Sequence, residues 1–301
     1  MDRTTETAIK GDHRSRPFNL TDIVSFIYII WVICLVSIFR QKVHLWYLYV
    51  LSYSLYFVFI LLITRLYQKY PASRVIAFLR HLYPVITFFF VYKSISGFVT
   101  VLYGGFIDPL VLKFQVSLFG GHPEVFLEKL VSPVMTEIMK FSYFSYYFYM
   151  PVSVLILFFS KRIKDLEYFV FMVTFMFYIC YAGFVLFPIE GPRFTLEALF
   201  RIKVLKGFIF TPLQDFLMVK GQTIGACMPS SHLAVAWTCL FLIRKFFGKL
   251  PFYIILPVIC VMSVAIVYNR YHYVADAVTG ILFALIFYPV GRKFYLAYEN
   301  K

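Results

Sequence analysis

Long apolar runs alternate with short polar connections along most of this chain. Eight of the runs approach the length of about 20 residues that a helix needs to cross the hydrocarbon core of a bilayer. They are residues 22–39, 46–64, 83–106, 141–160, 167–188, 232–248, 252–269 and 273–291. Because lipid offers no partner to backbone N–H and C=O groups, every run is predicted to be helical. The pattern therefore predicts an all-α, polytopic membrane helix bundle.

Two of the connections are too long to be simple loops. Residues 107–140 contain a Gly-Gly-His-Pro sequence at 120–123, which breaks a helix, followed by an acidic and apolar piece, 124–140. Residues 189–228 contain a second amphipathic stretch, 196–220. Amphipathic helices of this kind lie in the membrane interface. We expect both connections to cap a site and to admit a lipid from the side.

The composition excludes a soluble protein. Hydrophobic residues make up 61% of the chain and charged residues only 15%, whereas soluble domains contain about 25% charged residues. The net charge of +14 would also suit a nucleic-acid-binding protein. However, the Lys and Arg residues fall in short clusters between the apolar runs, which is a membrane-topology pattern, so no nucleic-acid partner is predicted.

The distribution of basic residues predicts the orientation. If the N-terminus is cytoplasmic, more than half of the 29 Lys and Arg residues lie in inside segments, as the positive-inside rule requires. Both termini are then cytoplasmic, and the polar clusters discussed next are non-cytoplasmic. We divide the chain into a cytoplasmic tail (1–21), N-terminal membrane helices with the interfacial segment 107–140 (22–160) and a catalytic membrane core (161–301).

His272 and Asp276 are the first candidate pair for chemistry. On a helix, residues four apart share a face, so the carboxylate can bind one imidazole nitrogen. That contact fixes the tautomer and makes the other nitrogen a better nucleophile. The alternative is a polar pair that only marks the membrane boundary.

A second cluster, Ser230-Ser231-His232, precedes an apolar run. Ser230 is a suitable N-cap, the free amides of a helix start bind phosphate, and His232 would be placed to protonate a leaving group. Arg193 and Arg270 offer planar donors to phosphate oxygens. Taken singly, the cluster could be an ordinary helix cap, and each Arg an interfacial anchor.

The combination favours a single site for phosphate chemistry, because all these residues lie at polar ends of spans on one predicted side. No metal or other cofactor is predicted. Of the five Cys residues, none are paired at the two-residue spacing typical of zinc sites. Cys227 lies near the polar centre and is interpreted as a packing residue.

These motifs resemble the type 2 phosphatidic acid phosphatase superfamily of integral membrane enzymes. Its second motif, Pro-Ser-Gly-His, corresponds to Pro229–His232, and the end of its third motif, His-(three residues)-Asp, corresponds to His272–Asp276. The likeness extends from Glu190 to about Arg292. The Gly191-Pro192-Arg193 sequence and the 107–150 stretch are similar to the branch of inositol phosphorylceramide synthases. The resemblance implies a six-helix phosphatase core with about two extra N-terminal spans.

The chain departs from the family pattern at several positions. The lysine of the first motif falls at Leu186, and the arginine of the third motif falls at Ile266. The glycine of the second motif is Ser231. Arg270, on the other side of the motif histidine, is a candidate replacement for the missing arginine.

The resemblance implies a metal-independent lipid phosphatase or phosphotransferase. His272 would form a phosphohistidine, Asp276 would orient it, and His232 would act as acid and base. The partners would be a lipid phosphate, the membrane and, for a transfer reaction, an alcohol or lipid acceptor. The alternatives are a phospho-headgroup transferase of the inositol phosphorylceramide synthase type, a non-catalytic lipid-phosphate transporter, and a subunit that uses the aromatic run 141–149 as a contact surface.

Overall fold

Long α-helices form the body of the protein. The computed structural model describes residues 17–300, which contain α-helices and short 3₁₀ turns but no β-strand. Seven of the described helices are long and apolar enough to cross a membrane. They are α1 (Leu20–Ile38), α2 (Trp46–Lys69), α3 (Arg74–Ile95), α6 (Pro133–Phe159), α7 (Ile163–Leu186), α11 (Lys249–Tyr268) and α12 (Val274–Glu299). The predicted all-α, multi-pass membrane bundle is confirmed.

The eighth predicted span, 232–248, corresponds to the shorter helix α10 (Ser231–Phe246). Its 16 residues give a length of about 24 Å, which is less than the roughly 30 Å of the hydrocarbon core. Much of its surface is buried, because it packs against α6, α7, α11 and α12. The N-terminus of α10 therefore lies inside the bundle.

Helix α7 occupies the centre. Of its most apolar stretch, 83% is buried, against 28–39% for the other six candidate spans. It contacts α1 and α3 on one side and α6, α10 and α12 on the other. Tyr178 on α7 also bonds to α1 and α2, because its hydroxyl lies 3.1 Å from the Tyr56 hydroxyl and 3.3 Å from Ser25 Oγ. Helix α7 thus connects the N-terminal helices to the rest of the molecule.

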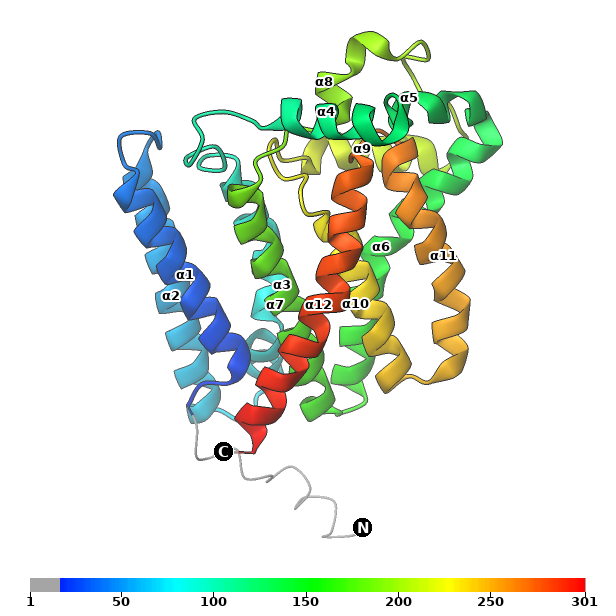
Figure 1. Ribbon diagram of the computed structural model, residues 1–301. Helices are drawn as coiled ribbons and strands as arrows, with labels where there is room; N and C mark the ends of the chain where they lie inside the picture. The colour runs from blue at the N-terminus through cyan, green and yellow to red at the C-terminus, as the bar shows by residue number, and fades with distance from the viewer. Residues whose placement is uncertain (1–16, 301) are drawn as a thin grey trace.

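Short helices cover one end of the bundle, at the top of Figure 1. They are α4 (Asp108–Phe119), α5 (Pro123–Phe126), α8 (Pro192–Thr195) and α9 (Phe210–Gly221). Helix α4 exposes Leu110, Phe114 and Leu118 along one face at four-residue spacing. An exposed apolar stripe on a helix across the end of a membrane bundle is typical of the lipid interface, as the sequence predicts for this segment.

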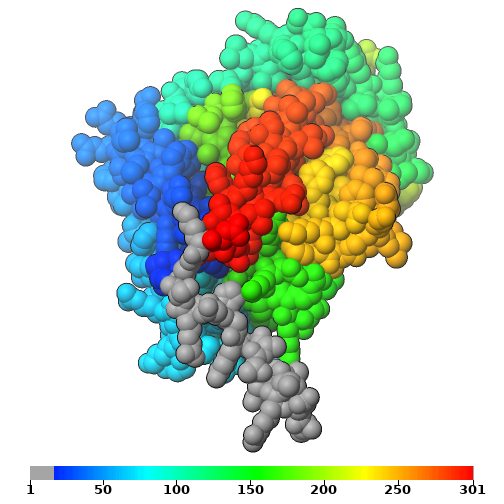
Figure 2. All heavy atoms as spheres, turned by 60° about the horizontal axis from the view of Figure 1, so that its bottom comes forward, coloured from blue at the N-terminus to red at the C-terminus, as the bar shows by residue number. Residues whose placement is uncertain are grey.

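The start of α1 and the end of α12 meet at the opposite end. The Tyr298 hydroxyl donates to the Phe18 carbonyl at 2.5 Å. Figure 2, which brings this end forward, shows α12 between α1 on one side and the helices α10 and α11 on the other. Both ends of the described chain therefore lie on the side away from the short helices. Their cytoplasmic placement stays a prediction, and the first 16 residues of the predicted tail lie outside the described residues.

Three predicted boundaries are wrong. Helix α6 begins at Pro133 rather than at residue 141, because Ser132 caps it by accepting from Met135 N at 3.2 Å. Helix α3 begins at Arg74, nine residues before its predicted start, and ends at Ile95. The predicted amphipathic stretch 196–220 contains a 3₁₀ turn, a loop and then α9.

Candidate active site

The connection between α11 and α12 carries the predicted nucleophile. His272 precedes α12, and Asp276 lies in the first turn of that helix. His272 Nδ1 lies 3.4 Å from Asp276 Oδ2. The predicted pairing is therefore present, but the expected geometry is wrong, because a turn rather than one helical face brings the two together. Asp276 also accepts from the Tyr273 amide at 2.9 Å, which fixes the carboxylate.

The start of α10 carries the second imidazole. Ser230 is the N-cap, as predicted, and its Oγ accepts from Leu233 N at 3.4 Å. The same Oγ lies 3.5 Å from His272 Nε2. The rings of His232 and His272 lie 6.0 Å apart, centroid to centroid. The structure thus brings together four predicted residues, His272, Asp276, His232 and Ser230, with Ser231 in the first turn of α10.

Two glycines allow this close approach. A Cβ atom on Gly280 of α12 would lie 2.5 Å from the Ser230 carbonyl oxygen. A Cβ atom on Gly183 of α7 would lie 2.6 Å from Pro229 Cδ. The Ser230 amide also donates to the Asp276 carbonyl at 3.0 Å. The start of α10 is therefore packed directly against the backbones of α7 and α12.

Helix α6 forms a wall of the site and contributes a cation. Rings of Tyr143 and Tyr146 lie 5.2 and 5.0 Å from the His232 ring, so part of the 141–149 aromatic run lines the site. One turn earlier, Lys140 is 2% exposed. Its Nζ donates to the Tyr271 hydroxyl at 2.9 Å and to Asp215 Oδ1 at 2.5 Å.

Lys140 is not among the site residues predicted from the sequence. A buried ionisable residue in a membrane span marks a functional site, and this signal was present in the sequence. The misplaced start of α6 hid it, because Lys140 was assigned to an interfacial loop rather than to a span.

Arg193 lies on α8 at the mouth of this region. It is exposed, and its Nη1 donates to Gln222 Oε1 at 3.3 Å. Burial raises the pKa of Tyr271, and Asp215 raises it further, whereas the charge of Arg193 lowers it. Arg193 is thus within electrostatic reach of the Tyr271 hydroxyl to which Lys140 donates.

Arg270 has other partners. Its Nη2 donates to Glu128 Oε1 at 2.8 Å and to the Ile202 carbonyl at 2.6 Å. Its guanidinium lies over the Phe200 ring, 3.9 Å from the centroid. Burial lowers the pKa of Arg270, and Glu128 partly opposes this. These contacts tie the end of α11 to two segments of the covering layer.

Helix α4 positions the reactive loop from above. Asp108 accepts from the amides of Glu190 and Gly191, both at 2.9 Å, and from the Tyr273 hydroxyl at 2.9 Å. Asp108 is not among the residues for which the sequence predicts a role. Its signal is an Asp followed by Pro at the start of a helix, which indicates a buried cap only when the partner segment is known. The covering layer therefore supports the loop that carries the nucleophile.

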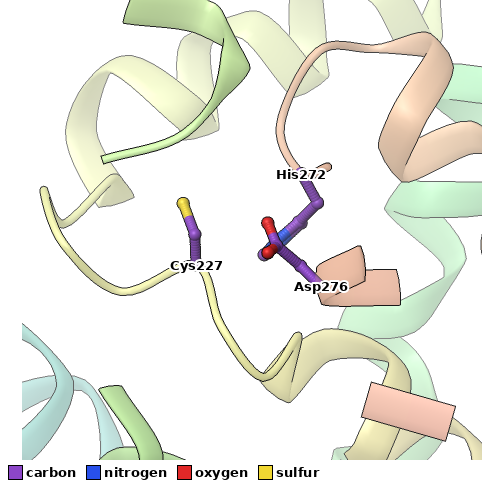
Figure 3. Close-up of side chains that lie close together, drawn as sticks. All are labelled: Cys227, His272 and Asp276. Carbon is purple, nitrogen blue, oxygen red and sulfur yellow. The ribbon is translucent and has the colours of Figure 1, made fainter. Parts of the chain in front are cut away.

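Cys227 lies on the loop before α10. Its Sγ lies 3.3 Å from the Glu190 carbonyl and 3.8 Å from the Tyr271 carbonyl. Burial raises the pKa of the Cys227 thiol well above its usual range, so the group is a protonated thiol. Figure 3 shows that Cys227, His272 and Asp276 gather from three separate segments, with one potential ligand atom from each within 4.8 Å of the others. Spacing along the sequence could not reveal this grouping.

One comparison with known proteins identifies a family. The family model described as the PAP2 superfamily matches residues 111–290, which is more than half of the chain. The matched region includes these candidate site residues: Lys140, Arg193, His232, His272 and Asp276. No curated protein and no solved structure matches the chain.

Proposed function

This chain belongs to the PAP2 superfamily, and from that membership and the site geometry we propose that it cleaves a phosphate ester or anhydride of a lipid through a phosphohistidine. The membership supports a lipid phosphatase-type function in the membrane. The observation that carries the mechanism is the pair of imidazoles 6.0 Å apart, one of them beside a buried carboxylate at 3.4 Å.

In the first step, His272 Nε2 attacks phosphorus. A bond forms between Nε2 and phosphorus while the bond from phosphorus to the lipid oxygen breaks. His232 gives its proton to that departing oxygen. Asp276 stabilises the positive charge that develops on the imidazole of His272, as a carboxylate behind a catalytic histidine does.

In the second step, the acceptor completes the reaction. The nitrogen of His232 that gave up its proton now takes a proton from water or from an alcohol. The acceptor oxygen attacks phosphorus, and the bond from phosphorus to His272 breaks. With water, an ester gives the lipid alcohol and free phosphate, whereas an anhydride gives the lipid phosphate and free phosphate. With an alcohol the product is a new phosphate ester.

The phosphate oxygens need positive charge around them. We assign this role to Lys140 and Arg193, together with amides in the first turn of α10 near Ser230 and Ser231, because the start of a helix binds anions. Lys140 takes the place of the family lysine that is absent at Leu186. Arg270 is left out of this assignment, because its Nη2 is already bound by Glu128 and Ile202.

The site lies at the end of the bundle opposite Phe18 and Tyr298. If both termini are cytoplasmic, as the basic residues predict, the reaction occurs at the non-cytoplasmic interface. Substituted-cysteine labelling of a residue on α9 in intact cells would test this side.

A panel of lipid phosphates assayed in detergent tests the function. Wild type should release lipid alcohol and free phosphate, and His272→Ala should reduce turnover to background. His232→Ala should lower the rate by about 10²- to 10⁴-fold, the usual contribution of general acid–base catalysis. His44→Ala, which changes an exposed imidazole on the α1–α2 connection, is the matched control.

Two outcomes would contradict the proposal. Full activity in folded His272→Ala would show that His272 is not the nucleophile. Absence of any product from the whole panel favours a lipid-phosphate transporter. Thin-layer analysis with and without an added alcohol then distinguishes hydrolysis from transfer, since only a transferase yields a new phosphate ester.

A further inference from the structure

We propose that Cys227, His272 and Asp276 form a binding site for Zn²⁺, and that Zn²⁺ bound there inhibits the enzyme. The inhibition rests on the proposed function, whereas the binding does not. Figure 3 shows the three side chains gathered from the loop before α10, the α11–α12 connection and the first turn of α12.

The donor set suits this ion. Thiolate, imidazole and carboxylate are the three ligand types that Zn²⁺ takes in proteins, with bonds of about 2.0 to 2.3 Å. In a tetrahedron with such bonds, neighbouring ligand atoms lie roughly 3.3 to 3.8 Å apart. The distance of 3.4 Å between His272 Nδ1 and Asp276 Oδ2 matches one edge. All three ligand atoms lie within 4.8 Å of one another, so the sulfur must approach by at most about 1 Å.

Buried polar atoms at this position are incompletely hydrogen-bonded. Within residues 17–300, His272 Nδ1 and Asp276 Oδ1 are buried and make no hydrogen bond. Their residues are 3% and 0% exposed. A buried carboxylate without full compensation is costly. Zn²⁺ with one thiolate, one carboxylate and one neutral imidazole carries no net charge, so the ion would offset that cost. Binding releases one proton, from the Cys227 thiol to water.

The loop that carries Cys227 is held in place. Residue 226 pairs with Ile189 in an isolated parallel bridge, and Asp108 fixes the next two amides of that segment. A Cβ atom on Gly191 would lie 2.9 Å from Cys227 Sγ, so glycine leaves the space that the sulfur occupies. The Glu190 carbonyl, 3.3 Å from Sγ, or a water molecule is available as a fourth ligand.

Zn²⁺ at this site opposes catalysis directly. The proposed nucleophile needs electron density pushed toward Nε2 by the carboxylate at Nδ1. A cation held by the same imidazole and carboxylate withdraws that density and takes the carboxylate away. We therefore expect that the enzyme needs no metal ion for activity and that a metal ion with affinity for thiolates inhibits it.

Equilibrium dialysis of the purified enzyme in phosphate-free buffer, with Zn²⁺ alone as the probe, tests the site. Wild type should bind one equivalent. Cys227→Ser should weaken binding by at least 10-fold, since even outer partners of a metal ligand contribute 10- to 100-fold. The Zn²⁺ concentration that halves the rate, measured relative to each protein's own uninhibited rate, should rise by the same factor. Cys260→Ser, which changes an exposed cysteine on α11, should change neither value.

A Co²⁺ titration gives a readout that is independent of activity. Wild type should show the charge-transfer absorption of a cobalt–thiolate bond, and Cys227→Ser should not. His232→Ala, whose rate is expected to be strongly reduced, should still bind Zn²⁺, so loss of the proposed function would leave this test intact. The proposal is overturned if wild type takes up no Zn²⁺, or if Cys227→Ser is inhibited at the same concentration as wild type.

Discussion

Gly280→Ala should slow the reaction without removing any group that takes part in it. Gly280 lies four residues after Asp276 on α12, and its Cα faces the backbone at the start of α10. An added Cβ would lie 2.5 Å from the Ser230 carbonyl oxygen and 3.0 Å from Ser230 Cβ. The first contact is closer than real Cβ atoms approach, and the second is tighter than most real Cβ contacts. The Ser230 carbonyl also belongs to the backbone, which cannot rotate away as a side chain can.

The size of the effect follows from these distances. To restore an ordinary contact, the start of α10 must move away from α12 by roughly 1 Å. His232 follows Ser230 by two residues and moves with it, whereas His272 stays with α12. A misplacement of about 1 Å costs about 10²-fold in rate, which corresponds to about 2.7 kcal/mol of activation free energy.

Stability should change much less. An alanine in a helix is favoured over glycine by up to about 1 kcal/mol, and overpacking costs about 1 to 3 kcal/mol, so the two effects partly cancel. We therefore expect kcat/KM to fall by about 10²-fold while the midpoint of thermal unfolding moves by only a few degrees. Gly291→Ala is the matched control, because it makes the same change in α12 against the side chains of Met172 and Phe175, both 3.0 Å away, rather than against backbone.

The assay is product release from a short-chain lipid phosphate, with unfolding followed by tryptophan fluorescence. If Gly280→Ala keeps at least half of the wild-type kcat/KM, the spacing of the two imidazoles does not control the rate. If Gly291→Ala loses as much activity as Gly280→Ala, the loss reflects a general disturbance of α12.

Four further outcomes test other parts of the site. Lys140→Met should lower kcat/KM by about 10²-fold, the effect of removing one donor to a reacting anion, and a value near wild type would exclude Lys140 from the phosphate site. Arg270→Met and Glu128→Gln should each destabilise the fold by about 3 kcal/mol in chemical denaturation, because each leaves a nearly buried charged partner unpaired. Rate measurements should show that kcat is retained in both variants. A loss of turnover without a loss of stability in Arg270→Met would instead support Arg270 as a phosphate ligand. Burial raises the pKa of Glu124, so the folded state holds this proton to higher pH than the unfolded state. Its contribution to stability should therefore fall as pH rises above about 4.3, the ordinary pKa of Glu, and Glu124→Gln should flatten that part of the curve. EDTA should leave the rate of purified enzyme unchanged, and a loss of activity that added metal restores would contradict the mechanism.

Hydropathy alone predicted most of the spans. The runs for α1, α2, α7, α11 and α12 lie close to the observed helices, because an apolar segment of this length has few other structures available in lipid. Hydropathy failed at the starts of α3 and α6, because the N-terminal parts of these helices contain charged residues. Arg80 of α3 is buried and is compensated by two hydrogen bonds to Asp22. Lys140 of α6 is buried and is compensated by its hydrogen bond to Asp215. A local window cannot see a partner that lies far away along the chain.

The same limit applies to the site. Local motifs located Ser230, His232, His272 and Asp276, because each pair is close in sequence and at the end of an apolar run. Lys140 was missed because the predicted span started one residue after it, and its contact with the Tyr271 hydroxyl, which joins residues 131 apart, leaves no local motif that would correct this.

Arg270 shows the opposite error. It is two residues from His272, which suggested a shared role. Its φ of 62° places the backbone in the left-handed region, so the chain turns there, and the guanidinium binds Glu128 instead. Proximity along the sequence is a poor guide to direction in a turn.

The central position of α7 has a consequence for the evolution and engineering of this protein. The region shared with the superfamily begins at residue 111, which suggests that α1–α3 are a separable addition. Yet the hydroxyl of Tyr178, at mid-helix in α7, is satisfied by Ser25 and Tyr56, both from that addition. In a shortened protein that starts at residue 111, this hydroxyl and the face of α7 that α1 and α3 cover would be exposed to acyl chains. We expect a functional minimal enzyme only when the first three helices are co-expressed as a second polypeptide that docks in the bilayer.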